Sequence, residues 1–301
     1  MKVSGLLRTT AQRLSRARLH YGHGAHNARE EAGWLVASVL GLPLDLQAKV
    51  TPEERRKFDA LIRRRIGERI PLAYLLKQAW LGEHSFYIDK RAVVPRSFIA
   101  ELLRDRLRPW LTRDPRRALD LCTGSGCLAV LLALTFGRSL VDAADLSKGA
   151  LAVAWTNVNR YRMKKRINLV KSDLFESLQK WKYDLIVSNP PYVIARSMKK
   201  LPKEYRHEPS MALAGGKDGL ALVHRTIAQA RDHLAPGGLL VCEIGGNRRA
   251  LERAYPELDF IWPETSEGPG CVFILEYEQL PRAARRGAAT RTPPRPVRAR
   301  R

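Results

Sequence analysis

The sequence predicts a doubly wound α/β sheet that follows a small helical domain and a β-hairpin linker. Two patterns indicate this order. Amphipathic helical patterns fill residues 28–70, whereas after residue 115 short apolar segments alternate with longer helical patterns. Such alternation is typical of a parallel sheet with helices on both faces. Because ligands of these sheets bind at the carboxyl ends of the strands, we expect the chemistry directly after the strands.

The helical domain is expected over residues 1–78. An apolar stripe at positions 32, 35, 36, 39 and 40 stops before Gly41, which is typical of a helix packed on a core. Thr51, the proline after it and Glu54 then form the pattern of an N-cap, a first helical position and a capping box. A second helix therefore begins there and ends before Pro71.

A β-hairpin linker is expected over residues 79–97. Gly82 separates two short apolar runs, Ala79–Leu81 and Phe86–Ile88, and Pro95 closes the segment. Two short runs around a glycine indicate a pair of antiparallel strands joined by a turn.

The α/β domain is expected over residues 98–280. Its strand candidates are short apolar runs bounded by polar or turn-forming residues. They are Ala118–Cys122, Leu140–Asp145, Asn168–Lys171, Tyr183–Ser188, Gly238–Ile244 and Cys271–Tyr277.

Charge is the unusual feature of the composition. Lys and Arg number 53 against 30 Asp and Glu, which gives a net charge of +23. Residues 281–301 hold eight Arg and no acid, cannot bury an apolar face, and are expected to form a disordered arginine-rich tail. Without them, 45 basic residues against 30 acidic ones leave +15, so the folded part is itself basic. We therefore expect a polyanionic partner, such as nucleic acid or a ribonucleoprotein.

Composition also excludes several classes of protein. An apolar content of 45% rules out a mainly disordered chain. No stretch approaches the roughly 18 apolar residues of a membrane span, and the N-terminus lacks the apolar run of a signal peptide. The four cysteines lie in or beside apolar segments without the spacing of a disulfide scaffold or zinc site, so free thiols and a cytoplasmic location are expected.

Three histidines, His20, His23 and His26, recur every three residues. Glycines at positions 22 and 24 would break a helix there, and no carboxylate completes a ligand set. We expect a helix-entry turn or surface histidines, and no metal.

A glycine-rich turn follows the first strand of the α/β domain. Asp120 and Thr123 precede Gly124 and Gly126, in a strand-to-helix turn where the backbone can approach a ligand. The pattern is neither the dinucleotide fingerprint nor a P-loop, because the third glycine and the Gly-Lys-Ser/Thr sequence are missing. A tight turn that binds nothing would have the same sequence.

Acids follow the second and third strands. Asp145 could accept both ribose hydroxyls of an adenosyl ligand, or it could be an acid that starts a helix near Ser147. Asp173 could accept from an adenine amino group, or it could cap the helical segment after it.

The most specific motif is Asn189-Pro190-Pro191-Tyr192 at the end of the fourth strand. The two prolines fix φ, lack N–H donors and direct their carbonyls outward. With the Asn189 side-chain oxygen, these acceptors could receive both protons of a planar NH₂ group. Tyr192 offers a π face to that plane or to a sulfonium.

Together, these motifs resemble S-adenosylmethionine-dependent methyltransferases that act on planar nitrogens. Two branches share the tetrapeptide, the DNA adenine methyltransferases and the HemK-type protein glutamine N(5)-methyltransferases. The rest of the chain is similar to the second branch, at Arg69–Leu75, Phe86–Asp89, Val94–Ser97 and Glu208–Pro209. The resemblance implies a Rossmann-like class I methyltransferase sheet behind an N-terminal substrate-recognition domain, and it covers about residues 20 to 278.

Within that family the chain resembles the enzymes for large-subunit ribosomal protein L-three. The similar segments are Tyr21–Gly24, Pro95–Ser97, Cys122–Cys127 and Glu204–Pro209. The release-factor branch more typically has Pro-Arg-Pro-Asp-Thr-Glu and Gly-Thr-Gly-Ala at the corresponding places. The partner implied is ribosomal protein L-three or an assembly intermediate that carries it, with non-specific rRNA contact through the basic surface and the tail, and no membrane.

The resemblance also implies roles for residues. The side chain of Asn189 and the carbonyl of Pro190 would hold the amide of a glutamine, and Tyr192 would support its plane. Pro191 and Glu208 would complete the substrate site. The cofactor would be S-adenosylmethionine, and the product S-adenosylhomocysteine. The cofactor-binding residues would be Asp120, Thr123, Gly124, Gly126, Asp145, Asp173 and Asn189.

Three functions other than methylation of L-three stay open, as does one place where the sequence differs from the family pattern. Adenine methylation would need a separate recognition domain for base flipping, and the roughly 25 residues between Tyr192 and the next expected helix are too few for one. Release-factor methylation and a non-enzymatic RNA-binding or assembly role are the other two. The family commonly has Gly-Asn where this chain has Gly245-Gly246-Asn247, which leaves the role of Asn247 open.

Overall fold

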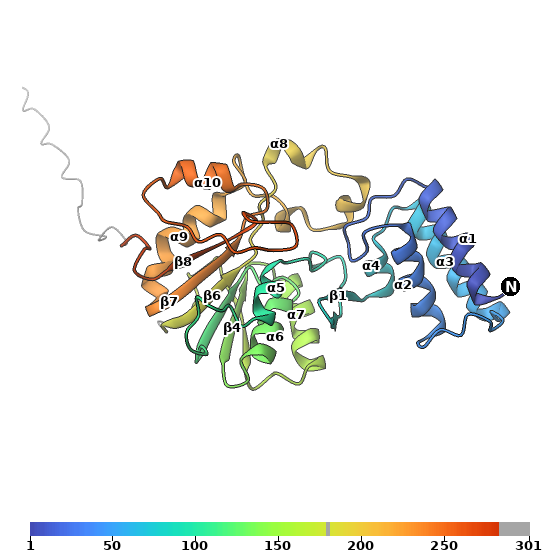
Figure 1. Ribbon diagram of the computed structural model, residues 1–301, viewed down its shortest axis with the longest axis horizontal. Helices are drawn as coiled ribbons and strands as arrows, with labels where there is room; N and C mark the ends of the chain where they lie inside the picture. Colours follow the sequence, from blue (N-terminus) through green and yellow to red (C-terminus); the bar gives the residue numbers. More distant parts are fainter. Residues whose placement is uncertain (179–180, 283–301) are drawn as a thin grey trace, which may run out of the picture.

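The computed structural model describes residues 1–178 and 181–282. Figure 1 shows three parts: a bundle of helices at the N-terminus, a short linker, and a twisted sheet flanked by helices. The order is the one that the sequence predicts. Most of the expected tail, residues 283–301, lies outside the described residues.

Helices α1–α4 build the N-terminal part, with bounds Val3–Arg16, Ala28–Leu40, Pro52–Gly67 and Leu72–Leu76. The predicted capping box is confirmed, because Thr51 Oγ1 accepts from Glu54 N and the Glu54 carboxylate accepts from Thr51 N. Leu6, Leu14, Leu35, Phe58 and Ile62 meet in one core. The sequence analysis did not single out α1, although Val3, Leu6, Thr10 and Leu14 recur at helical spacing.

The linker contains the predicted hairpin, with one strand displaced. Strands β1 (Ala79–Leu81) and β2 (His84–Phe86) pair antiparallel, and Leu81 is opposite His84. The expected strand Phe86–Ile88 is therefore wrong by two residues. Gly82 has φ +60° and with Glu83 forms a two-residue turn, so pairing resumes at the polar His84.

The main sheet has the strand order β5-β4-β3-β6-β7-β8, with only β8 antiparallel in this sheet. All six predicted strands are present, with ends that differ by up to four residues. The bounds are β3 Arg117–Leu121, β4 Leu140–Asp145, β5 Ile167–Lys171, β6 Tyr183–Ser188, β7 Leu234–Glu243 and β8 Val272–Glu276.

Helices cover both faces of this sheet, which confirms the doubly wound architecture. They are α5 Ile99–Arg104, α6 Cys127–Thr135, α7 Lys148–Arg160, α9 Ala221–His233 and α10 Arg248–Ala254. Along β6, Leu185 and Val187 join the core beneath α5–α7, whereas Ile186 joins the core beneath α9 and α10. This alternation is what a strand buried on both faces requires.

The strand order reverses between β3 and β6, so their carboxyl ends form the switch point at which such sheets bind ligands. A long segment, residues 193–216, leaves this edge and returns to it. It contains α8 (Ala195–Met198) and the 3₁₀ turns η1 (Lys203–His207) and η2 (Ser210–Ala212). We call it the arch; Figure 1 shows it in yellow, with α8 at the top and its further end near the N-terminal helices.

Within residues 1–178 and 181–282, no helix has the length and apolar character needed to cross a membrane.

Candidate active site

Two cavities open at the switch point and share a wall. The large cavity, about 370 Å³, is lined by Gly124, Asp145 and Asp173 among others. The small cavity, about 200 Å³, is lined by Arg96, Asn189–Tyr192 and Tyr205 among others. Both are lined by Val93, Cys122, Gly124, Asn189, Pro191 and Ala212. Two cavities that share a wall in this way could hold two ligands side by side.

The glycine-rich turn lies between the two cavities. Gly124 has φ +56° and Gly126 has φ +77°. A Cβ on Gly126 would lie 2.9 Å from the Cβ of Ala154, so the turn packs too closely against α7 for another residue. Thr123 and Gly124 line the small cavity, whereas Gly126 lines neither.

Asp120 holds this turn from beneath. It is fully buried, and its Oδ2 accepts from Thr123 Oγ1 at 2.5 Å and from Ala129 N at 2.9 Å. Burial raises its pKa to about 7, against the opposing effect of these two bonds. Asp120 lines neither cavity, so its contacts are with the turn.

Asp145 lines the large cavity at the end of β4. Its Oδ2 accepts from Gly124 N and its Oδ1 from Ser147 N, each at 2.8 Å. Burial raises its pKa, and these backbone bonds oppose the rise. A carboxylate can accept about four hydrogen bonds, so these backbone bonds leave part of its acceptor capacity for a ribose hydroxyl. Asp145 also stands at the start of a helix, as the alternative for this residue supposed, because its partner Ser147 is the N-cap of α7.

Asp173 lines the large cavity from the loop after β5. Its Oδ1 is 3.0 Å from Nη1 of Arg225, a residue of α9 that lines the same cavity. Its side chain is one-third exposed, and its second oxygen has acceptor positions for an amino group. The sequence analysis missed Arg225, because no local pattern links α9 to the end of β5.

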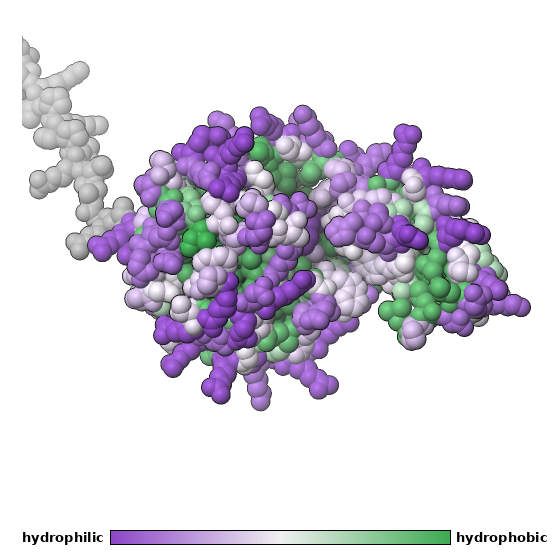
Figure 2. All heavy atoms as spheres, in the orientation of Figure 1, coloured by the Kyte–Doolittle hydropathy of each residue, from purple (hydrophilic) through white to green (hydrophobic). Residues whose placement is uncertain are grey.

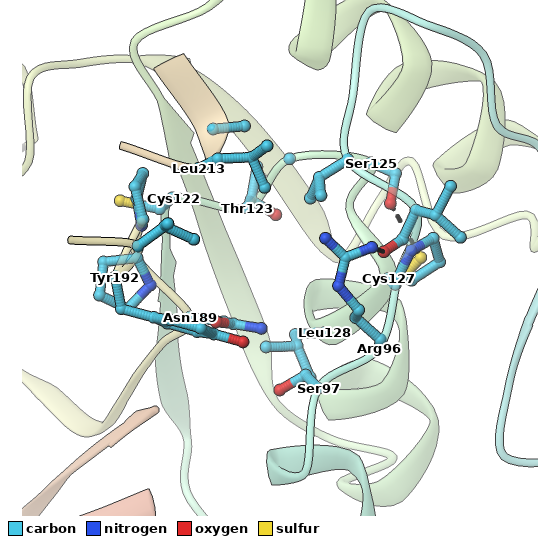
Figure 3. A pocket seen from close by; sticks show the side chains of 18 of the residues that line it. Arg96, Ser97, Cys122, Thr123, Ser125, Cys127, Leu128, Asn189, Tyr192 and Leu213 are labelled. Atoms are coloured by element: carbon cyan, nitrogen blue, oxygen red, sulfur yellow. Dashed lines mark hydrogen bonds between the residues drawn. The ribbon is translucent and has the colours of Figure 1, made fainter. Parts of the chain in front are cut away.

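The tetrapeptide begins where β6 ends. Ser188 Oγ donates to the carbonyl of Leu121 at 3.0 Å, which ties the end of β6 to that of β3. Asn189 follows and lines both cavities. Figure 3 shows Asn189 and Tyr192 on one side of the small cavity, with Arg96 and Ser97 on the other.

Tyr192 is fixed at its phenol, its ring and its backbone. The phenol donates to Glu243 Oε1 at 3.2 Å, and the backbone carbonyl accepts from Asn247 Nδ2 at 3.0 Å. The ring lies against Gly245, where a Cβ would be 2.8 Å from the ring carbon Cε2. The structure thus gives roles to two residues of Gly245-Gly246-Asn247, the segment that departs from the family's Gly-Asn. Gly245 leaves room for the ring of Tyr192, and Asn247 fixes its carbonyl.

Glu243 connects this tyrosine to the linker. Its Oε2 accepts from Ser97 Oγ at 2.7 Å and from Phe98 N at 2.9 Å. Burial raises its pKa to about 7, although the bonds from Ser97, Phe98 and Tyr192 favour the ionised form. The sequence analysis missed Glu243; an acid at the end of the apolar strand β7 was the available signal.

Glu208 lies behind the small cavity and lines neither cavity. Its carboxylate accepts from Arg96 at 2.8 and 2.7 Å and from Val94 N at 3.0 Å. Burial alone would raise its pKa, but the bonds from Arg96 and the nearby His23 hold it at about 2. These contacts favour a role in placing Arg96 over the direct substrate contact that the sequence analysis expected.

The expected histidine cluster divides in the structure. His26 precedes the N-cap Asn27, as expected for a helix entry. His23 is not at the surface: it is 5% exposed, and its ring centre lies 4.7 Å from that of Tyr205. The expectation of a surface position is wrong for His23, because Tyr205 of the arch covers it. In the described part of the chain, no group of three His, Cys, Asp or Glu is arranged to hold a metal ion.

Comparisons with known proteins agree with this geometry. The family model for the PrmC N-terminal domain matches residues 6–76, and that for the methyltransferase small domain matches residues 100–204. A protein of Neisseria meningitidis serogroup B named "Ribosomal protein uL3 glutamine methyltransferase" is 50% identical over 285 residues, covering 92% of this chain and 94% of its own length. Proteins of the same name from Burkholderia pseudomallei and Bordetella pertussis are 48% and 50% identical, covering 94% and 91% of this chain and 96% and 95% of their own.

These relatives match more than nine-tenths of the chain at about half of the aligned positions. The chain belongs to the family of the ribosomal protein uL3 glutamine methyltransferases.

Proposed function

We propose that this protein transfers a methyl group from S-adenosylmethionine to the side-chain amide nitrogen of a glutamine in ribosomal protein uL3. The products are N(5)-methylglutamine and S-adenosylhomocysteine. The observation that carries the proposal is the wall that the two cavities share, because it includes Asn189 of the tetrapeptide and Gly124 of the glycine-rich turn, so that a group bound in one cavity lies next to a group bound in the other.

The large cavity fits the cofactor. Its volume lies in the range of small-molecule sites, and Asp145 has acceptor capacity left for a ribose hydroxyl. Asp173 would accept from the adenine amino group, with Arg225 holding its carboxylate in place. Thr123, Gly124 and Asn189 would line the path toward the acceptor, whereas Asp120 and Gly126 would act by shaping the turn. Bound S-adenosylmethionine supplies an electrophilic methyl group on a sulfonium.

The residues of the small cavity would orient the amide. An amide nitrogen is a weak nucleophile, because its lone pair is delocalised into the carbonyl. Asn189 Oδ1 and the carbonyl of Pro190 would each accept one N–H, which orients the nitrogen toward the large cavity. Tyr192 would lie against the amide plane. Orientation and electrostatic stabilisation of this kind can each contribute several kcal/mol. After transfer the nitrogen loses one proton to Asn189, Pro190 or water.

These acceptors would also give selectivity. Buried acceptors left without a donor are costly, so a hydroxyl or ester substrate, which cannot supply two N–H groups, is rejected by a large factor. The amide of glutamine satisfies both acceptors, and so would the amino group of adenine. The experiment must therefore distinguish a protein substrate from DNA.

Purified protein with radiolabelled S-adenosylmethionine tests the proposal, with purified uL3, release factor and DNA in parallel reactions. Label in uL3 that runs as N(5)-methylglutamine after digestion is expected. Label only in release factor or only in DNA would overturn the substrate, and no label with intact binding of S-adenosylhomocysteine would favour the non-enzymatic role.

Asn189→Ala tests the mechanism separately. It removes one of the two amide acceptors, so turnover should fall by a factor of about 100, while calorimetric affinity for S-adenosylhomocysteine changes little. Near-wild-type turnover in this variant would contradict the assignment of Asn189.

The partner and location follow from the same proposal. A uL3 methyltransferase with a surplus of 23 positive charges would contact rRNA as well as protein, and it would act in the cytoplasm, where ribosomes assemble.

A further inference from the structure

The arch has two faces with different chemistry. Its inner side chains Val193, Leu201 and Tyr205 line the small cavity, with Ala212 and Leu213 beyond them. Its outer face carries positively charged side chains from α8 through η1, all of them exposed. They are Arg196, Lys199, Lys200, Lys203 and Arg206.

The two acids of the arch point away from this outer face. Glu204 is 2% exposed and lies 3.4 Å from Arg65 and 3.5 Å from Arg69, both in the N-terminal part. Glu208 is paired with Arg96 of the linker. Within residues 1–178 and 181–282, none of the five outer cations forms an ion pair. The outer face therefore carries a concentrated positive charge next to the small cavity.

Hydrophilic side chains project along the edge where Figure 1 places α8, as Figure 2 shows. Positive charge that is neither neutralised nor covered attracts polyanions, and each phosphate it neutralises releases a counterion. The same charge repels a basic protein. A protein that binds rRNA needs Lys and Arg for the phosphates, so free uL3 gains nothing from this surface.

We propose that the outer face of the arch binds the phosphate backbone of RNA, and that uL3 is therefore presented to the small cavity while it is bound to rRNA. The second clause rests on the proposed function; RNA binding by the arch does not. The arch would hold the RNA beside the cavity, so that an exposed glutamine of the bound protein enters it. This is an orienting and steering role, and it contributes no group to the chemistry.

Binding of a fluorescein-labelled RNA hairpin, followed by anisotropy, tests the surface with the full-length chain. The variant is Lys199→Gln, Lys200→Gln and Lys203→Gln together. The matched control is Arg138→Gln, Arg162→Gln and Lys165→Gln, which removes three exposed cations near the starts of β4 and β5, at the opposite end of the sheet. Both variants have the same net charge.

The arch variant should raise the Kd for the hairpin at least about tenfold near physiological salt and lower the slope of log K against log salt by about 2 to 3. The control should change both by much less. Equal losses in the two variants would show attraction by overall charge alone, and an unchanged arch variant would place RNA elsewhere; either result overturns the proposal. Binding of an acidic peptide in preference to the hairpin would do so too.

Methylation assays then test the presentation of uL3. On uL3 bound to an rRNA fragment, the arch variant should lose about tenfold in kcat/KM, the factor by which it weakens RNA binding, whereas on free uL3 it should match the wild type. Equal loss on both substrates would mean that these lysines act on the protein itself, against the inference. If the wild type methylates neither form, the proposed function fails, while the anisotropy result still decides whether the arch binds RNA.

Discussion

Gly245→Ala should slow methyl transfer without weakening cofactor binding. The new Cβ would lie 2.8 Å from the ring carbon Cε2 of Tyr192, and an ordinary contact begins at 3.4 Å, so the ring must move by about 0.6 Å. The ring has little freedom to move, because its phenol is bonded to Glu243 and its backbone to Asn247. The alanine must also adopt φ +54°, which costs about 1 kcal/mol.

The expected magnitude follows from that displacement. A misplacement of about 1 Å at a reacting group can cost roughly 100-fold, so a shift of about 0.6 Å should cost about tenfold in kcat, or about 1.4 kcal/mol. Steady-state kinetics on uL3 measures this loss, and calorimetry with S-adenosylhomocysteine provides the unaffected quantity, because Gly245 does not line the large cavity.

The neighbouring glycine supplies a matched control. A Cβ on Gly246 would meet no atom within 4 Å, so Gly246→Ala should keep wild-type kcat. The reasoning is refuted if Gly245→Ala also keeps wild-type kcat, or if both variants lose activity equally.

Three further results are expected. Glu208→Gln should lower the free energy of unfolding at pH 7 by about 2 kcal/mol in urea denaturation, since it removes the buried carboxylate that pairs with the partly exposed Arg96; unchanged stability with a raised KM would instead support direct substrate contact. Asp145→Asn should weaken S-adenosylhomocysteine about 10- to 100-fold by calorimetry, and it should also lower the melting temperature of the ligand-free protein, because one of the two oxygens that accept from Gly124 N and Ser147 N becomes an amide nitrogen; unchanged affinity would remove Asp145 from the ribose site. Glu243 has a folded pKa of about 7 against 4.5 for an exposed glutamate, so its contribution favours folding most below pH 4.5 and is lost as the pH rises to 7, by an amount on the order of 3 kcal/mol. Glu243→Gln should therefore flatten the decline in stability across this window, and an identical slope in both proteins would contradict the raised pKa.

Local patterns in the sequence predicted the order of elements well. Six apolar runs became the six strands of the main sheet, and Thr51 with Glu54 located the start of α3, because both signals depend on residues close in the chain. The hairpin was displaced by two residues, since the turn at Gly82 and not apolarity determines where β2 begins.

The candidate site was predictable only where its residues end strands. Asp145 ends β4, Asp173 and Asn189 follow β5 and β6, and fold class alone places these positions at one edge. Glu243, Arg225 and the role of Glu208 depend on partners more than 50 residues away in the chain, and such pairings leave no local pattern.

Glu204 and Glu208 attach the arch to the N-terminal helices and to the linker, respectively. The small cavity is lined by the linker, the arch and the α/β domain, and the arch is in turn attached to the N-terminal helices, whereas Asp145 and Asp173 lie in the α/β domain. Substitutions among the N-terminal helices that shift Arg65 or Arg69 would therefore move the arch wall of the small cavity while Asp145 and Asp173 stay in place.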